Sequence, residues 1–486
     1  MKKTLAILFA ICFFCISVGL AQVQKPSDLK FPPLKYDPPN PKDFRTEFAS
    51  GLHGYIQEDH SLPLFNISAI INFGDLYVPR DKQGLDSVMS ETLIDGGTKT
   101  KEGTVIKERI EFLGGSLSFR ADERTSTLSR SILSKDVDEG LDLFFDVLMN
   151  PEFREAPLNL AKVRLIQRLR QANDQPSEIL SREYERLIYG DHPLTWQPDK
   201  TSYESIAGAD LKAVHAQYFF PKNIILAASG DFNKSKLKAK IDKIVANWQN
   251  KKVTIPSFSK KFLEPEPGVY FIQKSINQGY ISLGHLGIEE TNPDYFAVQV
   301  MNFVLGGGSF TSRIVTKVRS DEGLAYNTGS RFRYRWGYPG TFSGYVQTKS
   351  STVGYAISLI INEFNRIRKE PVSDDEMETA INYYLESFSN SFESPQATMS
   401  TFANLEMTGK PMDYYNTYRD KIKSVTKATV QKAANKYIHP DKAAIMIVGD
   451  FEPCNKGGNQ WPGPLDKLGK VHMVKLKDPM TGEEMK

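Results

Sequence analysis

The feature that most constrains the fold of this 486-residue chain is an internal repeat. An apolar segment that leads into Gly-Asp-Phe occurs twice, ending at Phe232 and at Phe451, an offset of 219 residues. The same offset separates Pro176 from Pro395, Tyr218 from Tyr437, and Pro221 from Pro440. Matches at one fixed spacing indicate two copies of one structural unit.

The repeat divides the chain into an N-terminal half, 45–255, and a C-terminal half, 265–452, with a polar connector between them. Residues 22–44 contain six prolines, a composition that favours an extended arm with few internal hydrogen bonds. Residues 453–486 are rich in Gly, Pro and Lys and are expected to form a loose tail. We therefore expect two homologous half-domains between two irregular ends.

The first 21 residues have the organisation of a secretory signal peptide. Lys2 and Lys3 form a basic start, residues 5–16 are an unbroken apolar run, and residues 19–21 offer a small-residue cleavage site. An uncleaved anchor is the alternative, but the run is short for a membrane span. The sequence thus predicts an exported protein, periplasmic or secreted, whose mature chain has no membrane span.

Composition excludes several kinds of site. Lys and Arg total 61 against 58 Asp and Glu, so the net charge of +3 gives no electrostatic support for binding nucleic acid or anionic membrane. Removing the signal would leave Cys454 as the one cysteine, which excludes an internal disulfide and a cysteine-based metal site. Any metal site therefore depends on the placement of seven histidines.

Each half mixes the two kinds of secondary structure. Strand-like runs of β-branched and apolar residues are 64–73, 224–228, a segment near 270, 280–286 and 443–448. Apolar residues recur with helical spacing in 84–94, 136–148, 161–172, 294–305, 354–367 and 374–388. This order predicts an α+β fold in which each half has a mixed or antiparallel sheet with helices on one face.

Several motifs accompany the duplication. The segment 189–193 reads Tyr-Gly-Asp-His-Pro, 305–309 reads Leu-Gly-Gly-Gly-Ser, and 312–314 reads Ser-Arg-Ile. Residues 318–326 read Val-Arg-Ser-Asp-Glu-Gly-Leu-Ala-Tyr. Together with the paired Gly-Asp-Phe segments, these motifs make the chain resemble the pitrilysin-type, or insulinase-like, zinc peptidases, the family of the mitochondrial processing peptidase. The resemblance implies a clamshell of two homologous halves.

The family's zinc motif is His-x-x-Glu-His, in which two imidazoles on one helix face bind the metal and the glutamate activates a water. In the matching segment, 84–93, the two histidine positions hold Ser87 and Glu91, and the glutamate position holds Ser90. The neighbourhood of the third ligand holds Gln167 and Arg168. We therefore expect no zinc site and no cofactor on this chain. The histidines lie elsewhere, without that spacing, and are expected at the surface or in packing: His53, His60, His192, His215, His285, His439 and His472.

The second half retains the two residue types, an arginine and a tyrosine, with which the family binds its substrate. The resemblance implies that Arg319 and Tyr326, seven residues apart, contact the peptide and the carbonyl under attack. The alternative is an arginine paired with Asp321 or Glu322 and a tyrosine in the core. Gly306, Gly307 and Gly308 either form a mobile loop that approaches the peptide or only break a helix.

This pattern of loss and retention resembles the zinc-less partner subunits of the family. It predicts a pseudoenzyme, inactive alone, that binds an extended peptide substrate and completes the active site of a zinc-bearing insulinase-like peptidase in a heterodimer. A non-enzymatic scaffold or peptide-binding protein is the first alternative. A metallopeptidase with a relocated metal site is the second, so the sequence leaves open whether the chain is an enzyme.

Overall fold

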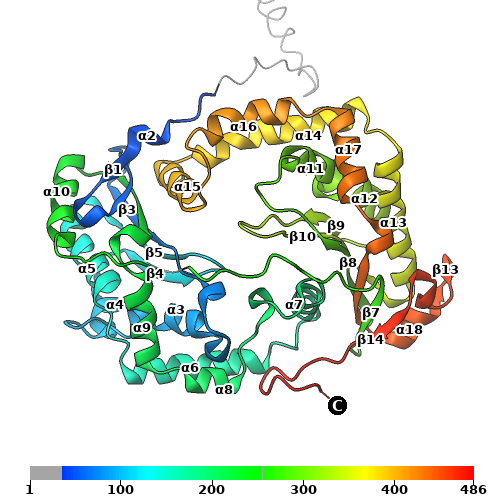
Figure 1. Ribbon diagram of the computed structural model, residues 1–486, viewed down its shortest axis with the longest axis horizontal. Coiled ribbons are helices and arrows are strands. Elements are labelled where there is room, and N and C mark those ends of the chain that lie inside the picture. Colours follow the sequence, from blue (N-terminus) through cyan, green and yellow to red (C-terminus); the bar gives the residue numbers. More distant parts are fainter. Residues whose placement is uncertain (1–35, 254, 486) are drawn as a thin grey trace, which may run out of the picture. The chain divides into compact units, whose positions relative to one another are not determined.

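The structure is a computed structural model that describes residues 36–253 and 255–485 (Figure 1). The predicted signal peptide, 1–21, and most of the predicted arm, 22–44, lie outside the described residues. The described end of the arm contains a short helix, α2 (Pro41–Phe44), whose start is capped by the side chain of Asn40. Within the described ranges no helix is both long and apolar enough to cross a membrane.

The N-terminal half contains a six-stranded sheet with the strand order β1-β2-β6-β3-β5-β4 (Figure 1). Strands β2 and β6 pair in parallel, and the other neighbours are antiparallel. The strands are β1 (Arg45–Glu47), β2 (His53–Glu58), β3 (Leu64–Ile71), β4 (Ser116–Ala121), β5 (Ser126–Leu133) and β6 (Ile224–Gly230).

The C-terminal half contains a second six-stranded sheet, ordered β14-β7-β11-β8-β10-β9. From its second strand onward this order corresponds to that of the first sheet strand by strand, including the parallel pair. The outermost strands do not correspond, because β1 comes from near the start of the chain and β14 from near its end. The predicted α+β class is thereby confirmed. The strands are β7 (Gly268–Gln273), β8 (Gln278–Leu286), β9 (Thr328–Phe332), β10 (Thr341–Lys349), β11 (Ala444–Gly449) and β14 (Val471–Met473), beside a small pair, β12 (Gly457–Gly458) and β13 (Trp461–Pro462).

Helices occupy most of the chain between the strands, and the predicted helical segments all fall on them with shifted ends. In the first half they are α3 (Leu85–Asp95), α4 (Gly103–Phe112), α5 (Val137–Met149), α6 (Glu155–Arg170), α7 (Pro176–Tyr189), α8 (Lys200–Ser205), α9 (Gly208–Tyr218) and α10 (Lys234–Val245). In the second they are α11 (Tyr295–Asn302), α12 (Arg313–Val315), α13 (Val353–Lys369), α14 (Asp374–Ser387), α15 (Pro395–Met407), α16 (Tyr414–Lys423), α17 (Lys427–Tyr437) and α18 (Phe451–Lys456).

One face of each sheet packs against helices of its own half and forms the main core of that half. Because side chains alternate along a strand, β3 turns Phe65, Ile67 and Ile71 toward this core and Ile70 toward the other face. The corresponding core of the second half includes Ile281 and Leu283 of β8. The predicted arrangement, with helices on one face of each sheet, is thus the arrangement of the two main cores.

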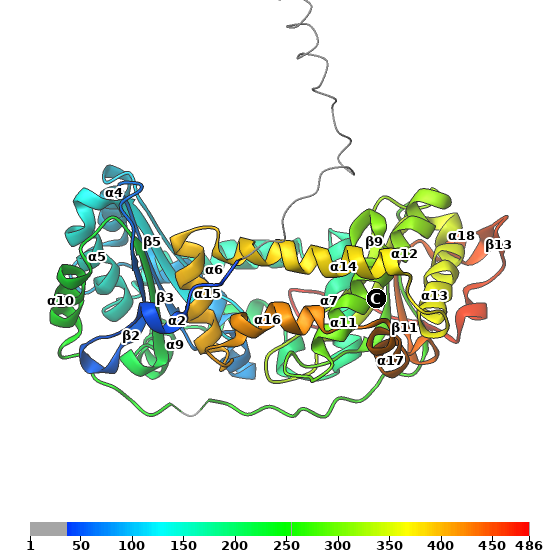
Figure 2. The same ribbon diagram turned by 90° about the horizontal axis from the view of Figure 1, so that it is seen from above.

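The opposite face of each sheet is covered by a helix from the other half (Figures 1 and 2). Met399, Phe402 and Ala403 of α15, in the second half, pack on Tyr55 and Ile225 of the first sheet. Reciprocally, α7 of the first half packs on β8 and β11 through the residues Ile179, Tyr184 and Ile188. Since α7 begins at Pro176 and α15 at Pro395, the exchanged helices are equivalent in the repeat.

The exchanged helix α15 is anchored by a carboxylate near its end. Glu406 accepts hydrogen bonds from Arg45 Nε (3.2 Å), Arg45 Nη2 (3.1 Å) and the Tyr55 hydroxyl (2.5 Å). His53 Nε2 lies 3.2 Å from the same group. Partial burial acts against the charged form, but the hydrogen bonds from His53, Arg45 and Tyr55 outweigh it and lower the pKa of Glu406 to about 2.

Glu406→Gln is therefore expected to lower the free energy of unfolding by about 2 kcal/mol at pH 7, because it removes a charged acceptor from several donors. Since the pKa of Glu406 in the folded protein lies below its ordinary value of 4.5, this stabilisation is full above pH 4.5. It is lost as the pH falls toward 2. Denaturant unfolding of both proteins at several pH values measures this. A difference that stays constant down to pH 2 would contradict the assigned role.

The segment 453–486, predicted to be a loose tail, is instead attached to the body. β14 pairs in parallel with β7 and forms the edge of the second sheet, and Leu465 is fully buried. Residues that follow reach the first half, where the backbone N–H of Lys200 donates to the Met480 carbonyl (3.1 Å). The prediction was wrong because pairing with an open sheet edge uses backbone groups, which composition does not reveal.

Candidate functional site

The helix that corresponds to the family's zinc-binding helix is α3, and its hydroxyl groups serve the fold. The Ser90 hydroxyl donates to the Asp86 carbonyl (2.9 Å) and accepts from the backbone N–H of Ala121 in β4 (3.0 Å). The Ser87 hydroxyl donates to the Asp86 carboxylate (3.2 Å). Burial raises the pKa of that carboxyl group. These bonds tie α3 to itself and to the sheet edge.

The third motif position, Glu91, is held by cations of α6. Arg168 forms an ion pair with Glu91, and Arg164 Nη1 lies 3.8 Å from the other carboxylate oxygen. Gln167 accepts a hydrogen bond from Arg170 (3.2 Å). Zinc requires three good ligands. Two serine hydroxyls and one carboxylate engaged by guanidinium groups do not fit zinc, so this region supplies no step of metal chemistry.

The histidines do not form a metal site elsewhere in the described structure. In the described part of the chain no group of three or more His, Cys, Asp or Glu side chains is placed to hold a metal ion. Burial lowers the pKa of His215 and of His285 to about 4, which keeps both rings neutral. The others lie apart: His53 beside Glu406, His60 between Glu58 and Asp231, His192 against Phe258 and Phe262 of the connector, His439 beside His285, and His472 on Tyr270.

Arg319 and Tyr326 lie together at a cavity of about 660 Å³ in the second half. Arg319 sits in a π-helical turn, 316–321, and a second π-helical turn, 303–307, carries the first glycines of the glycine run. Such turns occur often at functional sites. The cavity is lined by Asn302, Gly306, Gly307, Ser309, Val315, Arg319, Tyr326, Asn327, Thr328, Ser330, Arg331 and Tyr345.

Arg319 is held by aromatic rings. Its guanidinium carbon lies 4.1 Å from the centre of the Tyr326 ring and 4.3 Å from that of Phe310. Tyr326 is 83% exposed and Phe310 is 60% exposed. Stacking on rings leaves the edge N–H groups of a guanidinium available as donors. Phe310 was missed in the sequence analysis, because a single aromatic residue after a glycine run follows no pattern.

The alternative role of this pair, an Arg319 ion pair with Asp321 or Glu322 and a tyrosine in the core, does not match the geometry. Lys317 takes both nearby carboxylates, with Nζ 2.9 Å from Glu322 and 3.9 Å from Asp321. No carboxylate among the described residues forms an ion pair with Arg319, and Tyr326 is not in the core.

The glycine run has a packing role. A side chain at Gly306 would collide with the backbone of Ser330 in β9, and one at Gly307 would stand 2.8 Å from Asn302 Nδ2. Gly306 and Gly307 line the cavity with Arg319, but Gly308 is buried against Phe303 and does not. A contact of Gly306, Gly307 and Gly308 with a peptide, which the resemblance implies, stays a prediction. The helix α11 ends at Asn302, and the π-helical turn that continues it ends at Gly307, which supports the interpretation as a helix break.

Two sequence models that describe domains of one peptidase family match the chain. The model described as insulinase (peptidase family M16) matches residues 56–197, and the one described as peptidase M16 inactive domain matches residues 205–384.

Similar proteins lie at low sequence identity. A protein of Helicobacter pylori named non-peptidase homolog YmxG is 24% identical over 379 residues, which cover 76% of this chain and 85% of that protein. The probable mitochondrial-processing peptidase subunit beta of Arabidopsis thaliana is 21% identical over 428 residues, 84% of this chain and 78% of its own. The crystal structure of a peptidase M16 inactive domain from Pseudomonas fluorescens shares the fold, with a TM-score of 0.74 and 24% identity over 84% of this chain and 98% of that one.

Proposed function

Since the chain belongs to the insulinase (M16) family of peptidases, we propose that it is a non-catalytic subunit that binds an extended peptide and completes the active site of a zinc-bearing partner. The observation that carries the proposal is the contrast between the two halves. Arg168 engages Glu91 where the resemblance requires a metal ligand, whereas Arg319 keeps donors available beside an open cavity.

The available donors suit a peptide carbonyl. A guanidinium held by two rings presents N–H groups in a fixed plane, and the exposed Tyr326 hydroxyl adds a donor beside it. One similar protein is named a non-peptidase homolog and another is named a subunit, which supports a role in an assembly of unlike chains. The N-terminal segment 1–21 supports an exported, periplasmic or secreted, pair.

The direct test is a peptidase assay with and without a partner. The purified chain alone is expected to cleave no unstructured peptide, and addition of a zinc-bearing family member encoded at the same locus is expected to give cleavage that a chelator abolishes. Neither subunit alone should reach the activity of the mixture. Chelator-sensitive cleavage by this chain alone would contradict the proposal.

Two alternatives have distinct outcomes. A scaffold or peptide-binding protein would form the same complex, but the partner's cleavage rate would not depend on Arg319 or Tyr326. A peptidase with a relocated metal site would retain one equivalent of zinc after dialysis, measured by elemental analysis. We expect substoichiometric zinc, because the side chains at the family's motif positions do not fit the metal.

A further inference from the structure

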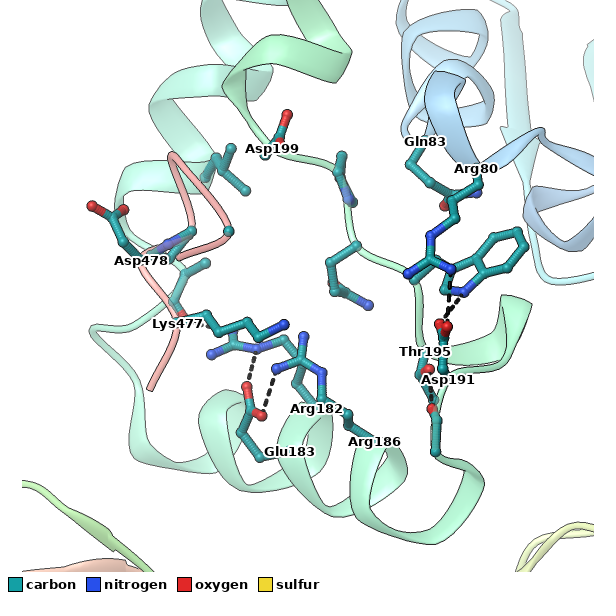
Figure 3. A pocket seen from close by; sticks show the side chains of 18 residues that line it. Arg80, Gln83, Arg182, Glu183, Arg186, Asp191, Thr195, Asp199, Lys477 and Asp478 are labelled. Atoms are coloured by element: carbon teal, nitrogen blue, oxygen red, sulfur yellow. Dashed lines mark hydrogen bonds and ion pairs between the residues drawn. The ribbon is translucent and has the colours of Figure 1, made fainter. Parts of the chain in front are cut away.

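A second cavity, of about 460 Å³, lies in the first half beside the exchanged helix α7 (Figure 3). The lining includes the apolar side chains of Leu169, Pro198 and Trp196, and α7 contributes Arg182, Glu183 and Arg186. The C-terminal segment closes one side with Lys477 and Asp478. The cavity therefore combines residues from three separate parts of the sequence, including Gly190 and Asp191 of the motif at 189–193.

A buried carboxylate organises the cationic side of this cavity. Glu183 is 5% exposed and accepts from Arg182 Nε (3.0 Å) and Arg186 Nη1 (2.7 Å). Arg182 also donates from Nη1 to the Ala172 carbonyl (3.0 Å) and from Nη2 to the Asn173 side chain (2.5 Å). Among the described residues the Arg186 side chain bonds to Glu183 alone, so its remaining N–H groups are available to a ligand.

Lys477 adds a third cation, which the attached C-terminal segment positions. Its backbone carbonyl accepts from Asn173 Nδ2 (3.0 Å), and Figure 3 shows its side chain extending toward the guanidinium groups of Arg182 and Arg186. Among the described residues no carboxylate forms an ion pair with the Lys477 ammonium group. Three cations thus gather around Glu183 at this end, while over the whole lining four cations face four carboxylates.

The other acids around the cavity are already engaged. Asp191 accepts from Arg80 (2.9 Å) and from the Trp196 indole (2.8 Å). Asp199 caps the start of α8 by accepting from the backbone N–H of Ser202 (2.7 Å), and Asp478 accepts from that of Met480 (2.7 Å). In Figure 3 Asp478 points away from the three cations. The end of the cavity at Arg186 and Lys477 is therefore the part where N–H donors are available to an anion.

We propose that this cavity binds a carboxylate group of the peptide, with Arg186 and Lys477 as its donors. A guanidinium and an ammonium group both suit carboxylates, and the apolar side chains in the lining offer contacts to the residue next to that group. The proposal rests on the proposed function, since it names the feature by which the peptide is held. The carboxylate is the peptide's C-terminus or an acidic side chain, which share this chemistry.

The test is equilibrium binding of a fluorescent peptide to the full chain without a partner. Three forms of one unstructured peptide are compared: free C-terminus, amidated C-terminus, and amidated with an internal Glu in place of Gln. We expect one carboxylate form to bind about tenfold more tightly than the neutral amide. The form that gains identifies the source of the carboxylate.

The gain should disappear in Arg186→Gln/Lys477→Gln and fall in Lys477→Gln. The Lys477 side chain forms no hydrogen bond or ion pair with a described residue, so its replacement is expected to leave the fold intact. The matched control is Lys475→Gln, a lysine of the same segment that lies outside the cavity and pairs with Glu484 (3.7 Å). It should keep the full gain. Equal binding of all three peptides, or a gain that survives in the double variant, would overturn the carboxylate site.

These outcomes separate the two proposals. If the peptides bind without preference while partner-dependent cleavage still requires Arg319, the carboxylate site is wrong and the proposed function stands. If the preference depends on Arg186 and Lys477 but cleavage does not depend on Arg319, the carboxylate site stands and the chain is a peptide-binding protein.

Discussion

Arg319→Ala is expected to lower the rate of partner-dependent peptide cleavage by about 10²–10³-fold, the usual cost of removing one donor to a developing oxyanion. The substitution should leave the free energy of unfolding nearly unchanged, because no described residue forms a hydrogen bond or ion pair with the guanidinium group. Initial rates at saturating peptide, measured with a fixed amount of zinc-bearing partner, give the effect. The loss should appear mainly in kcat if the contact strengthens in the transition state.

Two further variants define the role of the stack. Tyr326→Phe keeps the ring under the guanidinium and removes only the hydroxyl, so a smaller loss is expected than for Arg319→Ala. Lys369→Ala, at the exposed end of α13 and outside the cavity, is the charge-matched control and should retain full activity. If cleavage persists at the original rate in Arg319→Ala while the complex still forms, the chain acts as a scaffold.

The sheets could be predicted from the sequence because their signals are local. The apolar strands before Gly230 and Gly449, and the offset between them, specify the same strand in two equivalent sheets. Gly230 itself has a φ of +126° and lies against the Leu64 backbone, a position that a side chain cannot occupy. The glycine of the first copy therefore meets a backbone requirement of the first sheet.

The exchange of helices could not be predicted in the same way. Ile179, Tyr184 and Ile188 give α7 an apolar face, but the face has the same pattern whichever sheet covers it. The choice of sheet comes from long-range contacts, such as the hydrogen bond from the Tyr184 hydroxyl to the Phe342 carbonyl (3.2 Å). No periodicity in one sequence encodes such a partner, which is why the predicted cores lacked the second face of each sheet.

Those features of the candidate site that depend only on which residue stands at a position could be predicted from the sequence. Ser87, Ser90 and Glu91 exclude the zinc motif by their chemistry, and Arg168 was recognisable as a nearby cation. The packing of Phe310 on Arg319 and the arrival of Lys477 beside Arg186 depend on how distant segments meet. The roles of Phe310 and Lys477 could therefore be recognised only from the structure.

Phe402→Ala is expected to lower the free energy of unfolding of the whole protein by about 3–5 kcal/mol, the range for truncating a fully buried phenylalanine. Phe402 belongs to the second half, but its ring packs against Tyr55 of the first sheet (5.7 Å between ring centres) and against Phe44 (5.9 Å). The cavity thus opens in the core beneath the first sheet. Because each half supplies a helix to the other, we expect one shared denaturant transition in the wild type and in the variant.

Asn404→Ala, on the exposed face of the same helix, is the matched control and should change stability by less than about 0.5 kcal/mol. Denaturant unfolding followed both by tryptophan fluorescence and by circular dichroism checks whether the two probes coincide. If Phe402→Ala separated two transitions, one unchanged from the wild type, the halves would be independent domains and α15 would be a surface attachment. A single transition shifted to lower denaturant would instead show that the exchanged helices make the two halves one folding unit.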